Sequence, residues 1–166
     1  MEGISITTYQ SEYKDEIIDL ILGIQCKEFG IPITREDQPD LGDIPKVYQT
    51  GAGNFWVAAC GGNVVGTVAL FDIGNHQAAM RKFFINPSYR GSRYNTAKEL
   101  ITALTTWAAG HDIAEIFLGT TAQFLAAHRF YEKNGFTEIT KPDLPAAFPV
   151  MKVDTKFYYY QLPVGQ

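Results

Sequence analysis

The feature that most constrains the fold is a series of three strand-like segments in the middle of the chain. They cover residues 55–60, 64–71 and 78–85. Gly61-Gly62-Asn63 separates the first two, and Gly74-Asn75 lies between the second and the third. Short linkers rich in glycine and asparagine favour hairpin turns. The sequence therefore predicts three consecutive antiparallel strands.

Helical patterns flank these strands. Ser11 is expected to cap a helix whose apolar residues recur at helical spacing up to Ile24, and Gly30 is expected to end it. A longer helix is predicted after Pro87, because apolar residues within 97–108 fall on one face.

A third helix is predicted near the end of the chain. Thr120 and Gln123 have the spacing of a capping box, and the helix should run to about Asn134. Gly135 suits a left-handed residue after the helix, with Phe136 packing back on the last turn. Further strands are expected at residues 4–9, 113–118, 136–139 and 154–162, and a short helix at Asp43-Ile44-Pro45.

This order of elements predicts the fold class. It reads β-α-(α)-β-β-β-α-β-α-β-β, which is typical of a mixed α/β or α+β sheet with helices on both faces. The length of 166 residues and the apolar fraction of 46% fit one globular domain over residues 1–166. We therefore expect a mixed, mostly antiparallel sheet of about seven strands.

Charge and cysteine content narrow the classes of partner and compartment. The net charge of −4 gives no electrostatic case for binding nucleic acid or an anionic membrane. Cys26 and Cys60 lack metal-ligand spacing, and no pair of histidines has zinc spacing, so no metal is expected. The chain shows no signal peptide and no apolar run of about 20 residues. A cytoplasmic location is the simplest expectation.

The connection between the third strand and the long helix carries the first functional pattern. Its sequence is Asn86-Pro87-Ser88-Tyr89-Arg90-Gly91, followed by Ser92, Arg93, Tyr94, Asn95 and Thr96. The first amides of a helix lack intrahelical partners and carry partial positive charge, so they bind phosphate well. Gly91 would let the backbone approach a ligand closely, and two arginines add cationic donors. Taken alone, the pattern also fits an ordinary strand-turn-helix connection.

A second pattern, Phe130-Tyr131-Glu132-Lys133-Asn134-Gly135-Phe136, ends the last predicted helix. Together the two segments resemble the pyrophosphate loop and the A-x-x-F-Y-E-K-x-G-F helix of the GNAT superfamily, in particular its stand-alone bacterial members. The resemblance covers about residues 55–139. It implies an N-acetyltransferase with acetyl-CoA as co-substrate, which acetylates a primary amine by direct attack in a ternary complex. It also allows a homodimer.

The chain departs from the family pattern in its loop. Arg93 and Asn95 stand where the family has its second and third loop glycines. We expect Arg93 to contact phosphate directly. Thr96-x-x-Glu99 has capping-box spacing, which would start the helix later than in the family. Phe124 replaces an asparagine that often contacts pantetheine.

The resemblance also implies residue roles. Backbone amides of Phe83, Phe84 and Ile85 would contact the thioester and pantetheine, and residues 90–96 the pyrophosphate, with His128 beside the cofactor. Tyr131 matches the general acid for the departing thiolate. Full proton transfer from tyrosine to a thiolate is uphill by roughly 2 kcal/mol, so a hydrogen bond is easier to defend. The alternative for Tyr131 is a packing residue with a satisfied hydroxyl.

The general base and the acceptor are not identified by the sequence. Glu28, Glu36, Asp37 and Asp40 lie where the family places substrate-binding elements, and each also fits a solvated loop charge. His128 is three residues from Tyr131 and could serve as a proton shuttle. Two other classes stay open: a GNAT-like module that binds acyl-CoA without catalysis, and an unrelated α/β protein.

Overall fold

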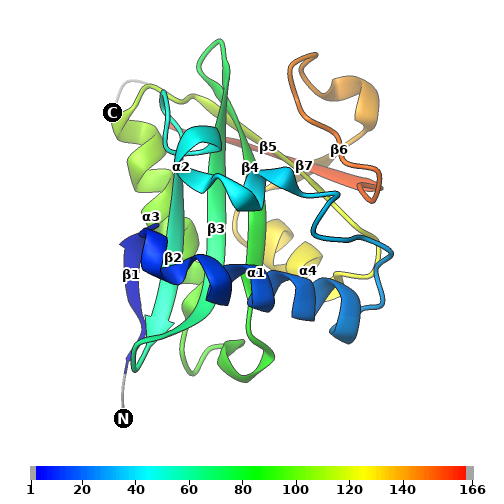
Figure 1. The fold of residues 1–166 in the computed structure, drawn as a ribbon. Coiled ribbons are helices and arrows are strands. Elements are labelled where there is room, and N and C mark those ends of the chain that lie inside the picture. Colours follow the sequence, from blue (N-terminus) through cyan, green and yellow to red (C-terminus); the bar gives the residue numbers. More distant parts are fainter. Residues whose placement is uncertain (1–2, 164–166) are drawn as a thin grey trace.

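A seven-stranded mixed sheet forms the centre of the protein (Figure 1). The structure is a computed structural model in which residues 3–163 are described. The strand order is β1-β2-β3-β4-β5-β7-β6, and every neighbouring pair is antiparallel except β4 and β5. The predicted fold class is confirmed. The strands are β1 (Ser5–Thr8), β2 (Asn54–Cys60), β3 (Asn63–Gly74), β4 (Gln77–Ile85), β5 (Glu115–Thr120), β6 (Thr137–Ile139) and β7 (Lys156–Gln161).

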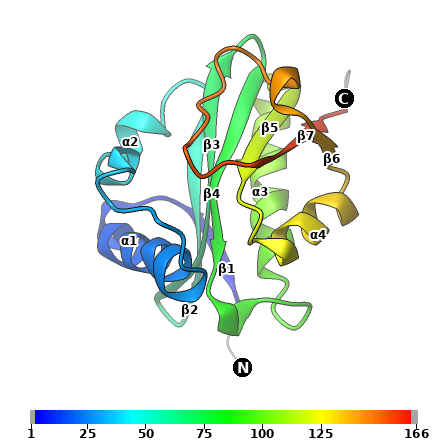
Figure 2. The same cartoon turned by 90° about the vertical axis from the view of Figure 1, so that its right-hand side faces the viewer.

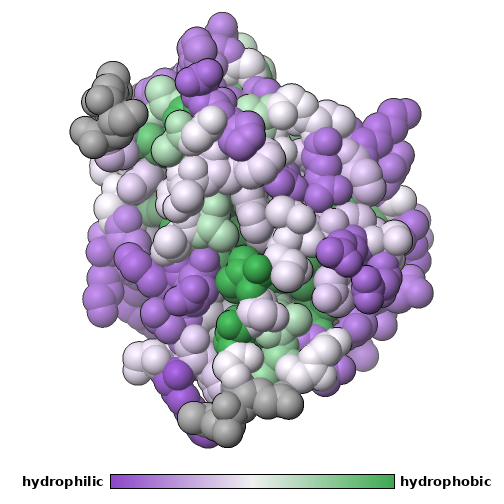
Figure 3. Space-filling model, turned by 90° about the vertical axis from the view of Figure 1, so that its left-hand side faces the viewer, coloured by the Kyte–Doolittle hydropathy of each residue, from purple (hydrophilic) through white to green (hydrophobic). Residues whose placement is uncertain are grey.

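Helices cover both faces of this sheet, as Figure 2 shows. On one face lie α1 (Lys14–Leu22) and α2 (Ile44–Val47), and on the other lie α3 (Thr96–Gly110) and α4 (Leu125–Lys133). Each face buries its own apolar cluster. One contains Ile17 of α1 and Phe55 of β2, and the other contains Leu100 and Leu104 of α3. None of the described helices is long and apolar enough to cross a membrane. The side of the molecule on the left of Figure 1 is mostly polar, with apolar side chains gathered in a small patch (Figure 3).

The parallel pair β4 and β5 stays together over only three residues of each strand. Gln77–Ala79 pairs with Glu115–Phe117. Beyond these positions the two strands separate, and β5 continues its pairing with β7 on its other side. The sheet is therefore split at its centre, between the two helical faces.

The helix boundaries differ from the predictions at three points. Ser11 does not cap α1, because a 3₁₀ turn at Ser11–Tyr13 comes first. The helix then continues as a π-helical segment, Gly23–Glu28, before Gly30 ends it with φ +63°. Thr120 is not a helix cap but the last residue of β5, where its carbonyl accepts a hydrogen bond from the Thr155 amide. Thr120 therefore pairs within the sheet instead of capping a helix, and α4 starts five residues after it, at Leu125.

Other turn predictions held or shifted slightly. Gly61 and Gly62 form the β2–β3 turn with positive φ. The β3–β4 turn uses Asn75 and His76, with φ of 55° and 61°, and Gly74 pairs with Gln77. Gly135 follows α4 with φ +92°, and the Phe136 amide donates to the Tyr131 carbonyl, as the sequence predicted.

Candidate active site

A cavity of about 760 Å³ occupies the split between β4 and β5. Its walls come from β4, from the start and face of α4, from the end of the α1 helix, and from the loop before β7. Of the site residues predicted from the sequence, Phe83, Phe84, Ile85, Arg90, Gly91 and Tyr131 line this cavity. Ser92, Arg93, Tyr94, Asn95, Thr96 and His128 do not.

A β-bulge shapes the β4 wall. Thr67 pairs with Phe84 and Ala69 pairs with Arg81, so Lys82 and Phe83 stand together opposite the single residue Val68. Lys82 adopts φ +56°, and its carbonyl accepts a 2.7 Å hydrogen bond from the Thr67 hydroxyl. A bulge adds one residue and changes where the following side chains point.

As a result of the bulge, Arg81 and Lys82 reach the same side of the sheet although they are adjacent. The Arg81 guanidinium lies 5.9 Å from the centre of the Tyr48 ring at the end of α2. The Lys82 amine lies 3.5 Å from Asp40, which also accepts the Tyr48 hydroxyl. In a regular strand these two side chains would point to opposite faces.

Tyr131 of α4 projects its ring into an aromatic cluster at the cavity wall. Ring centres of Phe83, Phe136 and Tyr158 lie 5.9, 5.4 and 5.3 Å away. The side chain is buried, and among the described residues no hydrogen bond to its hydroxyl is formed. Burial raises the pKa of Tyr131 well above its ordinary value. The hydroxyl is therefore a protonated donor, without a protein partner, at the edge of the cavity.

His128 does not lie in the cleft, contrary to the sequence-based expectation. Its Nε2 lies 2.9 Å from the Thr121 carbonyl, and its ring packs 6.1 Å from Tyr158, which Tyr131 also contacts. Burial lowers the pKa of this imidazole. His128 and Tyr131 are three residues apart on the helix and both pack on Tyr158, but the imidazole is held by the Thr121 carbonyl and does not line the cavity.

The loop between β4 and α3 has the backbone geometry that its sequence required. Gly91 has φ +90°, and Asn95 has φ +57° immediately before α3. The predicted Thr96-Glu99 capping box is absent, because the Thr96 hydroxyl donates to the Tyr89 carbonyl at 3.0 Å. The first amides of α3 still lack intrahelical partners. Gly91 and Ala97 border the cavity, so this helix terminus faces it.

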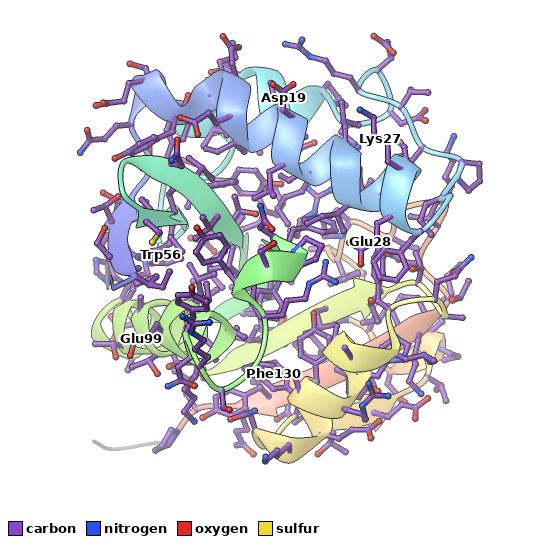
Figure 4. The ribbon with its side chains drawn as sticks, turned by 90° about the horizontal axis from the view of Figure 1, so that it is seen from below. Asp19, Lys27, Glu28, Trp56, Glu99 and Phe130 are labelled. Carbon is purple, nitrogen blue, oxygen red and sulfur yellow. The ribbon has the colours of Figure 1, made fainter. Side chains whose placement is uncertain are left out.

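Arg90 joins this loop to the end of the α1 helix. Its guanidinium donates to both carboxylate oxygens of Glu28 at 2.6 and 2.8 Å, and its Nε donates to the Ile85 carbonyl at 2.8 Å. Figure 4 shows Glu28 at the end of that helix, on the side toward the split strands. Glu28 is therefore an ion-pair partner and not a solvated loop charge.

Asp37 and Asp40 also have specific partners. Asp37 pairs with Lys152 at 3.0 Å and accepts the Thr34 amide. Asp40 belongs to a buried polar cluster with Tyr48, Lys82 and Gln38, in which Gln38 accepts a 2.5 Å hydrogen bond from the lysine. Desolvation lowers the pKa of Lys82 to about 8, and Asp40 partly offsets this effect.

Two further charged residues of the cavity wall were given no role from the sequence, in which Arg81 and Lys82 only marked the absence of a carboxylate base before the loop. Arg81 lines the cavity from β4, and Asp154 lines it from the loop before β7. Asp154 accepts the Met151 amide at 2.9 Å and lies against Gly119 of β5. Two consecutive cations in an otherwise apolar strand are the one sequence pattern that could have indicated the bulge. Nothing in residues 140–155 marks Asp154.

The cavity thus lies where the sheet splits, and Tyr131 and the residues next to the α3 N-terminus border it. Residues 18–136 match the Acetyltransferase (GNAT) family, so the chain belongs to that family. An acetyltransferase of the GNAT family from Staphylococcus aureus Mu50 has a very similar structure, with a TM-score of 0.94 and 40% identity. That alignment covers 97% of this chain and 100% of the other.

Two other matches are more distant. N-acetylaspartate synthetase of Xenopus tropicalis is 36% identical over 104 residues, which are 60% of this chain and 37% of that protein. The chain thus spans little more than a third of that relative's length. N-acetylglutamate synthase from Neisseria gonorrhoeae, complexed with coenzyme A and N-acetyl-glutamate, shares the fold with a TM-score of 0.72 at 15% identity. That likeness covers 96% of this chain and 35% of the other.

Proposed function

We propose that the protein transfers an acetyl group from acetyl-CoA to a primary amine, by direct attack of the amine in a ternary complex. The observation that carries this proposal is the Tyr131 hydroxyl, which borders the cavity with no hydrogen-bond partner among residues 3–163. A polar group that borders a cavity and has no protein partner is free to bind a ligand group. The distant fold neighbour whose structure contains coenzyme A is consistent with acetyl-CoA as the donor.

Different segments of the cleft suit different parts of acetyl-CoA. The amides at the start of α3 suit the pyrophosphate, with Gly91 allowing close approach. Backbone amides of β4 after the bulge, from Phe83 to Ile85, suit the acyl and pantetheine groups and would stabilise an oxyanion at the thioester carbon. The Tyr131 hydroxyl suits the departing sulfur. Because burial raises its pKa, this hydroxyl serves as a hydrogen-bond donor to the thiolate more readily than as a full proton source.

The test is release of free thiol from acetyl-CoA with a panel of amines, together with calorimetry of CoA binding. An acetyltransferase binds CoA and releases thiol in proportion to an acetylated product found by mass spectrometry. A module that binds acyl-CoA without catalysis would bind CoA and release no thiol with any amine. That second outcome would overturn the proposal and favour a sensor or interaction role.

A further inference from the structure

The part of the cavity lined by Arg81, Lys82, the end of the α1 helix and the loop before β7 lies outside the segments proposed to bind acetyl-CoA, and we call it the acceptor side. Its charged groups have an arrangement that the proposed transfer of acetyl groups does not by itself explain. Arg81 and Lys82 face the cavity from β4, and Asp154 faces it from the loop before β7. Apart from Gln25, whose amide is paired with Gln38, the rest of this side is formed by the apolar residues Ile24, Ile33, Phe148, Pro149, Met151 and Val153. A charged group in an apolar wall raises the free energy of the folded protein unless it is paired with another group or with a charged ligand.

The two cations are not equivalent. Lys82 already has Asp40 at 3.5 Å and Gln38 at 2.5 Å, and its side chain is only 3% exposed. Arg81 forms no ion pair with any described residue; its contacts are the Met151 sulfur at 3.2 Å and the Tyr48 ring. Its guanidinium is therefore the cation that a ligand carboxylate can reach. Guanidinium groups bind carboxylates through two parallel hydrogen bonds.

Asp154 is the complementary group. It has no cation partner among the described residues, although Arg81 and Lys82 act on it electrostatically across the cavity. Burial raises the pKa of its carboxyl. Its oxygen lies 2.6 Å from the place that a Cβ on Gly119 would occupy, so it sits beside β5 near the point where the strands separate. An ammonium group next to Asp154 would therefore lie at the split where the thioester is proposed to bind.

We infer that the acceptor is a free α-amino acid with an apolar side chain, whose carboxylate pairs with Arg81 and whose amino group faces Asp154. The inference rests on the proposed function and names its substrate class. The cluster of Arg81, Lys82, Asp40 and Asp154 carries two positive and two negative formal charges, so a zwitterion adds no net charge to it. The apolar walls take the side chain. On this side an acidic side chain would find no second unpaired cation among the described residues, because Lys82 is held by Asp40; the other cavity-lining cations without an ion pair, Arg129 and Lys133, belong to α4.

The proton balance of the reaction then follows. Asp154 accepts one proton from the ammonium group, and the neutral amine attacks the thioester carbonyl carbon. The carbon–sulfur bond breaks as the amide forms, and the nitrogen loses its second proton. The thiolate leaves while hydrogen-bonded to Tyr131 and takes up one proton, and Asp154 releases the other to solvent. The products are an N-acetyl amino acid, CoA as its free thiol and one proton.

The first experiment needs no variant. Thiol release is measured for the wild-type chain with leucine, leucinamide and 3-methylbutylamine, which share a side chain and differ in the carboxylate. We expect kcat/KM for leucine to exceed that of both analogues at least tenfold, as expected for one charge-assisted contact. We also expect aspartate to be a poorer acceptor than leucine. Equal rates for the three leucine compounds would overturn the inference while leaving the proposed acetyl transfer intact, and so would a preference for aspartate.

The second experiment separates the two residues. Arg81→Gln should raise KM for the amino acid about tenfold or more and leave the decarboxylated amine within a few-fold of wild type. Asp154→Asn should lower kcat for both acceptors by about 10²-fold or more. Arg35→Gln, which changes an exposed loop arginine, is the matched control and should change neither. A uniform loss with both acceptors in Arg81→Gln would show a structural role and overturn the assignment of the carboxylate.

A binding measurement covers the case in which no acceptor is turned over. The thermal unfolding midpoint of the CoA complex is measured with each of the twenty amino acids, and the expected result is an increase with apolar ones. No increase with any amino acid would overturn the inference. CoA binding in the same samples then shows whether the cofactor part of the proposed function survives.

Discussion

Replacing Tyr131 by phenylalanine removes one oxygen from the edge of the cavity and leaves the aromatic cluster in place. The ring contacts with Phe83, Phe136 and Tyr158 do not involve the hydroxyl. Because that hydroxyl has no hydrogen bond among the described residues, its loss should change the free energy of unfolding by less than about 1 kcal/mol. Tyr131→Phe should therefore fold normally.

The expected catalytic effect is much larger. Unperturbed tyrosine and thiol pKa values of about 10 and 8.5 make full proton transfer unfavourable by roughly 2 kcal/mol, and burial widens that gap. The hydroxyl should instead stabilise the thiolate as a fixed donor, a role whose loss costs about 10²–10³ in kcat, or about 2.7–4 kcal/mol. Affinity for acetyl-CoA should stay within a few-fold of wild type, because the contact strengthens only as charge develops on sulfur.

The assay is single-turnover thiol release with a saturating acceptor, and calorimetry gives the affinity for acetyl-CoA. Tyr158→Phe is the matched control, since its hydroxyl donates to Glu132 at 2.6 Å and it does not line the cavity. That variant should lose stability and keep its rate. A wild-type rate for Tyr131→Phe, with chemistry shown to be rate-limiting, would make Tyr131 a packing residue.

Three further predictions concern the loop and the buried lysine. Gly91→Val should weaken CoA binding about tenfold in calorimetry, because φ of +90° disfavours a branched residue and the loop must change shape. The control is Gly74→Val, at φ +85° in the distant β3–β4 hairpin, which should lower stability and leave the affinity for CoA unchanged. Arg93→Ala should weaken CoA binding by about 1–3 kcal/mol and pantetheine binding much less, whereas equal losses for both ligands would assign Arg93 to the fold. Lys82 holds its proton less tightly in the folded protein, with a pKa of about 8 against 10.5, so stability should rise with pH between these values, by on the order of 3 kcal/mol relative to Lys82→Met. Urea unfolding at several pH values would contradict this if the two proteins showed parallel pH dependences.

The sequence predicted the sheet well, because its strands and turns depend on local patterns. Alternating apolar residues and turn glycines identified β2, β3 and β4, and the Gly135 end of α4 followed from helix-ending rules. Tyr131 and Gly91 were found through motif spacing, and both border the cavity.

The acceptor side depends on long-range contacts, which no local pattern encodes. Asp40 looked like a solvated loop charge, yet it is buried by partners from α2 and β4. Asp154 gains its position only when β7 pairs with β5. His128 does not line the cavity, and its partner, the Thr121 carbonyl, lies in a loop that the sequence assigned to a helix.

Because of the bulge in β4, neighbouring residues of this strand contribute to different walls of the cleft. Arg81 contacts Tyr48 at the end of α2 and Lys82 contacts Asp40 in the 3₁₀ turn before α2, whereas Phe83 packs against Phe130 of α4. Two adjacent codons can therefore change the charge on one wall while the aromatic packing of the other wall stays intact. Deleting either codon would instead remove the extra residue of the bulge. The strand would then alternate regularly, and two consecutive side chains would no longer lie on one face.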